Sequence, residues 1–403
     1  MGLTPSLRPM LRPGRRALFG SLAAVAAAAV LAGCSGSIPL FDSGPPPAGP
    51  QQPATAIGSG QVRVAVILPL SASGNAGAVA QSMRNAAELA LVEFNSPNVQ
   101  LLIKDDGGTS GGAQQAAQAA LNEGAEIIIG PLFAHSVAPA GQIARGRNVP
   151  VIAFSTDASV ATRGVYLLSF LPESDVDRVV EFAASRGKRS FAALIPENAY
   201  GNVVDAAFRQ AVARTGGRVI ALERYPADAS RMQEAVRRIA PALAQADSLF
   251  LPGDPEIVPQ ITQALATAGG INLRRLQFLG TGLWDDQRIY TDSTLQGGWF
   301  AAPETAGFRG FSNRYKAKYG QDPLRAATLS YDAISLVAAL VKTQGPQRFT
   351  EQVLTNPSGF SGIDGIFRFK SDGGNDRGLS IVRVTPSGPQ VVSTAPKAFA
   401  GQT

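Results

Sequence analysis

The sequence is poor in the side chains that carry much enzyme chemistry. Its 403 residues contain one cysteine, Cys34, and one histidine, His135. A single cysteine excludes an intramolecular disulfide framework and a cysteine-cluster metal site, and a single histidine disfavours zinc hydrolases and histidine-dependent triads. The GxxxxGK[ST] and HExxH motifs are absent, as is GxSxG after residue 33. We therefore expect no enzyme, no cofactor and no metal site, and chemistry by acidic residues alone is the remaining enzymatic alternative.

Outside residues 1–33 the chain also lacks a large excess of basic or of acidic residues. The chain has 36 basic and 30 acidic residues, and residues 1–33 hold four arginines and no acid. The remaining 32 basic residues nearly balance the acids, which disfavours nucleic-acid binding because such binding needs a clustered basic face. Hydrophobic residues make up 45% of the chain and charged residues 16%. This composition supports a sizeable core and excludes wholesale disorder.

Residues 1–33 have the pattern of a signal peptide. A basic segment precedes the apolar run 17–32, which is shorter than the roughly 20 residues of a spanning helix but suits a secretory signal. Residues 31–34 (LAGC) resemble a bacterial lipobox, which implies cleavage before Cys34 and its lipidation. The alternative is a buried free cysteine behind an N-terminal anchor. Arg15-Arg16 loosely resemble a twin-arginine signal, so the export route stays open.

The mature chain is expected to be a periplasmic body attached to a membrane by lipid, on the inner or the outer membrane. No other stretch reaches 18 apolar residues. Residues 34–60 have one charge, Asp42, among many prolines and glycines, and such a segment cannot form a core. We predict an extended tether there.

From residue 61 the chain alternates between strand and helix patterns. Predicted strands at 62–68, 101–103, 126–129 and 149–154 are separated by predicted helices at 78–94, 113–122 and 136–145. A second block repeats this order from residue 175 to residue 280, followed by helices at 308–319 and 326–343 and strands at 360–369 and 380–385. Residues 386–403 read as a loose tail. Repeated strand–helix–strand units predict an α/β protein with two doubly wound, Rossmann-like lobes and a hinge.

Ligands of open α/β sheets bind beyond the carboxyl ends of the strands, so the loops after the strands hold the candidate ligand-binding residues. Hydroxyls and free amides at helix N-termini suit a carboxylate, and an acid such as Asp157 suits an amine. The candidates are Ser71, Ser73, His135, Ser136, Ser155, Thr156, Asp157, Tyr200, Asp254 and Trp284.

Each candidate has a structural alternative. Ser73, Ser136 and Asp157 also suit helix caps, His135 suits a surface position, and Trp284 suits the core. Residues 372–376 (DGGND) have a calcium-loop composition but lack the closing glutamate, which favours a turn.

Several segments resemble type I periplasmic binding proteins of the leucine/isoleucine/valine-binding type. They are residues 64–73 (VAVILPLSAS), 105–106 (DD), 127–132 (IIIGPL), 149–155 (VPVIAFS), 200–201 (YG), 277–280 (QFLG), 315–320 and 331–333. The resemblance covers roughly residues 61–390. It implies two lobes joined by three hinge crossings, a small-molecule ligand in the cleft, and the permease of an ABC importer as partner.

The same resemblance gives the expected boundaries of the two lobes, and it shows where this sequence differs from the family's ligand-binding residues. Lobe I is expected at 61–170 plus 305–356, lobe II at 171–304 plus 357–390, and a tail at 391–403. Four positions that hold an amino acid in the family fall at Ala134, Asp157, Gly253 and Gly282, whereas Ser155 and Tyr200 retain the family's character. We therefore expect this chain to share the family's fold, and we do not expect leucine to be its ligand.

The lipobox, the proline-rich tether and the altered cleft also resemble a sister group, the penicillin-binding-protein activators, whose partners are peptidoglycan synthases. Two functions therefore remain: a solute receptor with an open polar cleft, and a regulator whose cleft is filled by apolar side chains.

Overall fold

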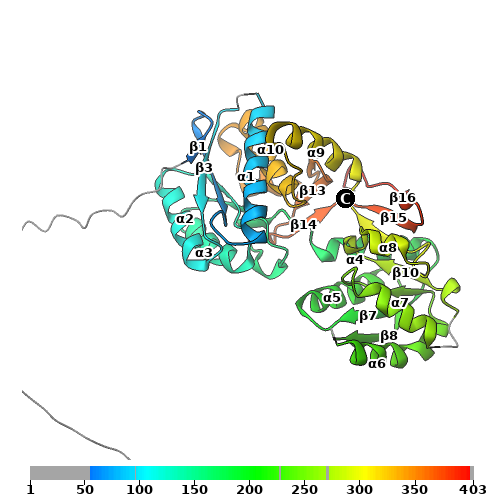
Figure 1. Cartoon of the computed structure of the whole chain (residues 1–403). Coiled ribbons are helices and arrows are strands. Elements are labelled where there is room, and N and C mark those ends of the chain that lie inside the picture. Colours follow the sequence, from blue (N-terminus) through cyan, green and yellow to red (C-terminus); the bar gives the residue numbers. More distant parts are fainter. Residues whose placement is uncertain (1–54, 96, 227, 269–271, 400–403) are drawn as a thin grey trace, which may run out of the picture. The chain divides into compact units, whose positions relative to one another are not determined.

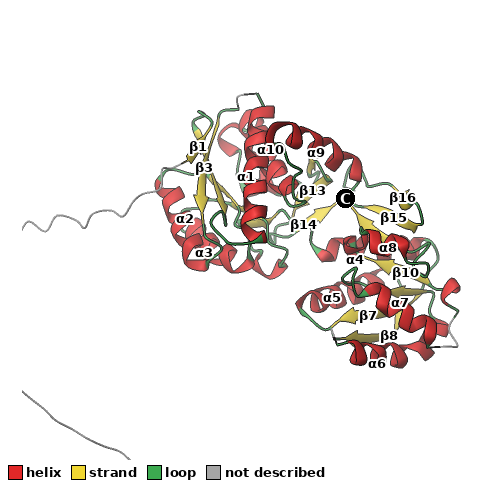
Figure 2. Cartoon of the chain, in the orientation of Figure 1, coloured by secondary structure: helices red, strands yellow, loops and turns green. Residues whose placement is uncertain are grey.

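The computed structural model describes residues 55–95, 97–226, 228–268 and 272–399, which belong to one compact unit, Gln52–Thr403. The expected signal peptide, Cys34 and most of the expected tether lie outside these residues. Two lobes are present, each with a mainly parallel sheet between helices (Figures 1 and 2). Within the described ranges, no helix has both the length and the apolar character needed to span a membrane. The predicted fold class is confirmed.

The first lobe is built on a six-stranded sheet in the order β1-β3-β2-β4-β5-β6. Its strands are β1 (Thr55–Ile57), β2 (Val62–Leu68), β3 (Val99–Asp105), β4 (Ile127–Ile129), β5 (Val151–Ala153) and β6 (Val165–Leu167). All neighbours are parallel except β1 and β3. The edge strand β1 falls inside the segment 34–60, which the sequence assigned to the tether. The sheet of lobe I therefore includes residues that precede the predicted start of the lobe at residue 61.

Strand β2 shows why this sheet is buried on both faces. Val64, Val66 and Leu68 enter one core cluster, whereas Ala65 and Ile67 enter another, as the alternation of side chains along a strand requires. Helices α1 (Asn75–Glu93) and α10 (Ala327–Thr343) cover the first face. Helices α2 (Ser110–Asn122) and α3 (Ala134–Arg145) cover the second. Helices α9 (Thr305–Tyr319) and α11 (Glu351–Leu354) complete the lobe.

The second lobe is built on a seven-stranded sheet in the order β16-β15-β11-β10-β9-β7-β8. Its strands are β7 (Ser190–Pro196), β8 (Arg218–Tyr225), β9 (Ser248–Phe250), β10 (Gln277–Gly280), β11 (Trp299–Ala302), β15 (Ser380–Thr385) and β16 (Gly388–Ser393). Helices α4 (Pro172–Ser185) and α5 (Ala199–Arg214) cover one face. Helices α6 (Ala229–Ile239) and α7 (Val258–Thr267) cover the other, and α8 (Gln287–Thr291) follows β10.

Two boundaries near the C-terminus differ from the expected ones. A three-stranded antiparallel sheet, made of β12 (Phe360–Gly362), β13 (Gly365–Phe369) and β14 (Asn375–Arg377), replaces the single strand expected at 360–369. Phe367 and Phe369 pack in the core cluster of lobe I, so these strands belong to lobe I and not to lobe II. Strand β16 pairs with β15, so the sheet of lobe II continues into the segment expected to be a tail.

The chain passes between the lobes three times. The crossings run from β6 to α4, from β11 to α9 and from β14 to β15. This is the three-crossing hinge that the family resemblance implied. The side chains on and next to these crossings form the site described below.

Candidate functional site

A cavity of about 520 Å³ lies beside the first two crossings, which contribute Phe170 and Pro303 to its wall. Residues of both lobes line it, and most of the lining surface is apolar. The lining residues are Thr156, Phe170, Pro172, Asp175, Tyr200, Thr281, Gly282, Leu283, Asp285, Ala302, Pro303, Thr305, Phe308 and Arg325. Concave, mainly apolar cavities of roughly 300–1,000 Å³ are typical of small-molecule sites.

Phe170, Phe308 and Arg325 form one wall of the cavity, and Arg377 lies behind it; we call these four residues the cation–aromatic cluster. The Arg325 guanidinium carbon lies 4.6 Å from the Phe170 ring centroid and 4.7 Å from that of Phe308. The Arg377 guanidinium carbon lies 4.7 Å from the Phe170 centroid. Cation–π contacts of this kind hold the rings in place, so the wall is ordered by residues from all three crossings and from the start of α10.

The charge of Arg325 is balanced inside the protein. Its Nη2 lies 2.7 Å from Asp364 Oδ1 and its Nη1 lies 3.0 Å from Asp364 Oδ2. Asp364 is fully buried and also accepts a hydrogen bond from Thr328 Oγ1 at 2.6 Å. A two-point contact between guanidinium and carboxylate is strong and geometrically fixed, so Arg325 faces the cavity as a neutralised pair.

Asp175 is placed at the cavity by the first turn of α4. Its Oδ2 accepts a hydrogen bond of 2.9 Å from the Gly282 amide, and no described protein group donates to its Oδ1. Burial raises the pKa of Asp175 to about 7, while the Gly282 amide and the positive charge of Arg377 oppose that rise. The site therefore contains a carboxyl group that titrates near neutral pH.

Two hydroxyl groups lie beside this carboxyl. Tyr200 Oη and Thr281 Oγ1 share a hydrogen bond of 2.8 Å, and both residues line the cavity. Burial raises the pKa of Tyr200 well above its usual value, so the phenol stays neutral. Tyr200 is held by the start of α5, where Asn198 Oδ1 accepts a hydrogen bond from the Gly201 amide at 2.8 Å.

Of the ten candidate residues from the sequence, Thr156 and Tyr200 line the cavity. Ser155 lies next to Thr156 but is buried, and its Oγ accepts a hydrogen bond from the Asp157 amide at 3.0 Å. Asp157 accepts from the Ser159 amide at 2.9 Å and thus serves as a cap, the structural alternative for this residue.

Four more candidates lie in lobe I, on the loop after β2 and at the start of α3, and do not line this cavity. Ser71 and Ser73 are exposed in the loop after β2, where the Ser71 amide donates to Asp105 Oδ1 at 3.2 Å. His135 is exposed, stacks on Phe133 with 5.5 Å between ring centroids, and contacts the Gly108 carbonyl oxygen at 2.9 Å. Ser136 is buried one position further along α3.

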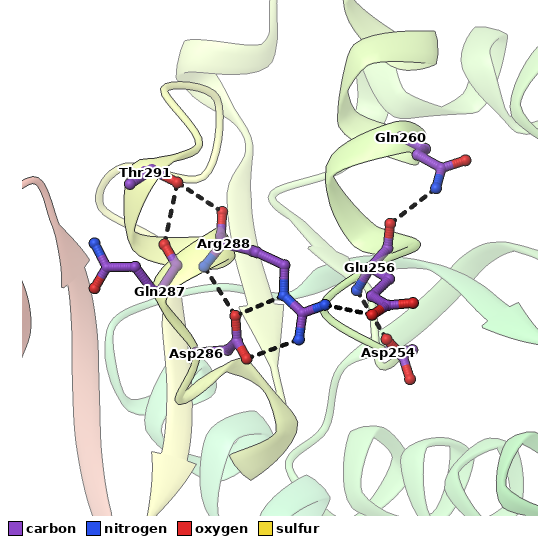
Figure 3. Close-up of polar contacts among 7 residues, drawn as sticks. All are labelled: Asp254, Glu256, Gln260, Asp286, Gln287, Arg288 and Thr291. Carbon is purple, nitrogen blue, oxygen red and sulfur yellow. Dashed lines mark hydrogen bonds and ion pairs between the residues drawn. The ribbon is translucent and has the colours of Figure 1, made fainter.

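The last two candidates, Asp254 and Trp284, are structural residues of lobe II. Asp254 Oδ1 accepts from the Glu256 amide at 2.8 Å at the start of α7, and Arg288 ties Glu256 to Asp286 (Figure 3). Trp284 is fully buried, and its Nε1 donates to the Leu251 carbonyl oxygen at 3.1 Å. Trp284 is therefore a core residue, because its ring is packed inside the lobe and its single polar atom is hydrogen-bonded there.

Sequence reasoning missed most of the cavity wall. Phe170, Asp175 and Phe308 lie on or beside crossings between the lobes, and Arg325 lies in the loop between α9 and α10. A search restricted to loops after strands passes over such segments. The one available signal was the run YLLSFLP at residues 166–172, which lies between the two repeating blocks and has the composition of a strand that crosses between them. Of residues 372–376, the first three lie in the expected turn, in which Gly374 N donates to Asp372 Oδ1 at 2.8 Å, whereas Asn375 and Asp376 begin β14. No cluster of potential metal ligands occurs among the described residues.

A family model described as periplasmic binding protein matches residues 61–389 of the chain. No curated protein matches this chain. Among solved structures, a Rhodospirillum rubrum protein assigned to branched-chain amino acid ABC transporters has a TM-score of 0.72 and 20% identity, covering 82% of this chain and 99% of that one.

Two further structures link the fold to different ligands. A leucine-binding protein from Thermotoga maritima has a TM-score of 0.55 and 19% identity, covering 83% of this chain and 98% of that one. The other is a solute-binding protein of an ABC transporter from Rhodopseudomonas palustris BisB5, in complex with 3,4-dihydroxybenzoic acid. It has a TM-score of 0.56 and 19% identity, covering 84% of this chain and 97% of that one.

At these identities the solved structures show a shared fold. The family match is broader evidence, because it runs continuously through both lobes and all three crossings. The chain belongs to the periplasmic binding protein family.

Proposed function

We propose that the protein is a lipid-anchored periplasmic receptor, without enzymatic activity, that binds a small solute in the cavity and delivers it to an ABC importer. The observation that carries this proposal is the cavity of about 520 Å³ that residues of both lobes line, beside the first two crossings. A solute there contacts residues of both lobes at once, which is the arrangement by which a two-lobed protein can clamp a ligand.

The chemistry of the wall bears on the class of solute. Similar structures include a leucine-binding protein and a complex with an aromatic acid, so the fold itself accepts different solutes. Here Phe170, Phe308 and Leu283 supply apolar surface, and Asp175, Tyr200 and Thr281 supply polar atoms. We propose a small solute with a sizeable apolar part as the ligand, an amino acid being one example.

The alternative function, a regulator of peptidoglycan synthesis, was expected to have a cleft filled by apolar side chains. The crossings of this protein instead surround open space, although the surface of that space is more apolar than we expected for a receptor. The open volume favours the receptor.

Thermal unfolding of the full-length protein with separate solutes tests the proposal. The panel comprises branched-chain amino acids, aromatic carboxylates and apolar amines. A solute at about 1,000 times its Kd stabilises the folded state by roughly 4 kcal/mol, which raises Tm by several degrees. A Tm that no member of the panel shifts would contradict a receptor for these classes.

A matched pair of variants places the binding in the cavity. Thr305 lines the cavity and is exposed, so Thr305→Trp fills the space without disturbing the core. The neighbouring Ala306 is exposed and is not a lining residue, so Ala306→Trp is the control. We expect Thr305→Trp to abolish the ligand-induced rise in Tm and Ala306→Trp to retain it, and equal responses would place the binding elsewhere.

A further inference from the structure

The charges around the cavity are unbalanced toward the negative. Arg325 is the one basic residue that lines the cavity in the described part of the chain, and it is paired with Asp364. Two acids, Asp175 and Asp285, also line the cavity, and neither takes part in an ion pair among the described residues. An anionic ligand would therefore meet two carboxyl groups without a cationic partner, although Asp285 accepts a hydrogen bond from Tyr290 Oη, and no unpaired cation on the described lining surface.

The layer behind the cavity does not reverse this balance. Arg377 is almost fully buried, and its Nε donates to the Ser169 carbonyl oxygen at 2.8 Å. Its charge acts on Asp332 and Asp364 as well as on Asp175. Its two Nη atoms are buried without a described partner, and Arg377 does not line the cavity, so a ligand in the cavity does not meet this guanidinium directly.

Asp175 is the acid best placed to hold a ligand. The Gly282 amide fixes its Oδ2 at 2.9 Å, which leaves Oδ1 as an acceptor without a described protein donor. Asp175 is half-buried, and a carboxylate that is partly removed from water without a cationic partner is destabilised, so a cation placed beside Oδ1 offsets that cost. The neutral hydroxyls of Tyr200 and Thr281 lie beside it as further polar atoms.

The rest of the wall suits an apolar group. Phe170, Phe308, Pro172, Leu283 and Pro303 line the cavity together. An ammonium at Asp175 with an attached ring or alkyl chain would bury that apolar part against these side chains. Amino acids are less suited, because their carboxylate adds a second negative charge to a site that already has two.

We propose that the ligand of this cavity is an amphipathic amine, with its positively charged nitrogen at Asp175 and its apolar body against Phe170 and Phe308. This inference rests on the proposed function, since it names the class of solute that the receptor takes. The relatives bound to leucine or to an aromatic acid carry a carboxylate in their ligands, so the inference separates this protein from them.

The binding should depend on pH, because the amine needs the ionised form of Asp175. Burial raises the pKa of Asp175 to about 7 in the empty site. The groups that act on it are Glu173 on its own helix, Arg377 on β14, the Gly282 amide after β10 and Tyr200 on α5. Amine affinity should therefore fall as the pH drops below about 7, where the carboxyl group takes up a proton.

Isothermal titration calorimetry of the full-length protein tests this proposal with four probes of similar shape. They are 2-phenylethylamine, 3-phenylpropanoate, phenylalanine and 2-phenylethanol. We expect the amine to bind most tightly, and Asp175→Asn to weaken it about 10- to 100-fold while leaving the neutral alcohol unchanged, as for the loss of one charged contact. Asp177→Asn is the control, because Asp177 lies on the same helix and pairs with Arg214 outside the cavity.

The outcomes separate the two proposals. If 3-phenylpropanoate or phenylalanine binds more tightly than the amine and Thr305→Trp abolishes that binding, the receptor function stands and the amine inference is wrong. If Asp175→Asn unfolds near the wild-type Tm yet binds the amine as tightly as the wild type, the inference is also wrong. If no probe and no solute of the wider panel binds, the receptor function itself fails.

Discussion

Asp332 carries a carboxyl oxygen without a partner in the interior of lobe I. Its Oδ1 accepts a hydrogen bond from the Ile363 amide at 2.8 Å, whereas its buried Oδ2 has no described donor. A Cβ at Gly362 would lie 2.3 Å from that Oδ2, so the close approach of β12 requires glycine there. Burial raises the pKa of Asp332 to about 7, against the opposing charge of Arg377.

This raised pKa predicts how stability changes with pH. The folded state keeps a proton on Asp332 that the unfolded state releases near its ordinary pKa of 3.8. The free energy of unfolding should therefore decrease as the pH rises from about 4 to about 7, by up to about 1.4 kcal/mol per pH unit for one group. Asp332→Asn cannot titrate and retains an acceptor for the Ile363 amide, so we expect it to flatten this decrease.

Urea unfolding across that pH range measures the effect. Asp175 contributes a decrease of the same sign, so the slope of Asp332→Asn should be reduced but not abolished. Asp322→Asn is the control, because Asp322 is exposed and pairs with Lys316 at the surface. Identical slopes in the wild type and Asp332→Asn would show that Asp332 does not titrate in this range.

At the scale of elements, the start of α5 links stability to the cavity. Asn198 caps this helix through the Gly201 amide, and Tyr200 lies between the two residues. Asn198→Ala should cost about 1 kcal/mol of stability and also weaken ligand binding, because the Tyr200 hydroxyl loses its fixed position. Urea unfolding and ligand titration of the same variant measure the two effects.

A second cap provides the comparison for this variant. Thr109 Oγ1 accepts a hydrogen bond from the Gly112 amide at 3.0 Å at the start of α2, and α2 does not line the cavity. Thr109→Ala should lower stability to a similar extent and leave ligand affinity unchanged. A loss of affinity of equal size in both variants would mean that the effect of Asn198→Ala comes from general destabilisation.

The elements also show what the sequence could predict. The run VRVAVIL at 62–68 is unmistakable as a buried strand, and β2 has those bounds. Strand β1 was missed because it is three residues long and adjoins a segment rich in proline and glycine. The closing segment 360–369 read as one strand, whereas Gly362 and Gly365 flank a turn between β12 and β13.

The cavity was harder to predict than the strands for a physical reason. Phe170, Phe308, Arg325 and Arg377 lie in separate segments, and only the three-dimensional path of the crossings brings them together. No local periodicity marks such residues. Tyr200 was found because it lies at the start of α5, just after the short loop that follows β7, where ligands of such sheets bind.

At the scale of the whole molecule, the lipid anchor stays a prediction that lies outside the described residues. We expect the wild-type protein to be processed before Cys34 and to fractionate with membranes, because acyl chains attached there bury apolar surface in the bilayer. Cys34→Ser removes the acceptor and should abolish lipid attachment. Mass spectrometry of the mature N-terminus, with Ser35→Ala as the control, measures this, and membrane-bound Cys34→Ser with an unchanged mass would contradict it.

The three crossings have a consequence for how the chain is made. Both lobes are assembled from distant stretches of sequence: the core of lobe I needs Phe367 and Phe369, and that of lobe II needs Ile381 and Val384. A nascent chain on the ribosome therefore cannot close either core until almost its whole length has been translated. Such a chain lacks a completed core in either lobe for nearly all of its synthesis, and an incompletely folded polypeptide can be threaded through a narrow export channel.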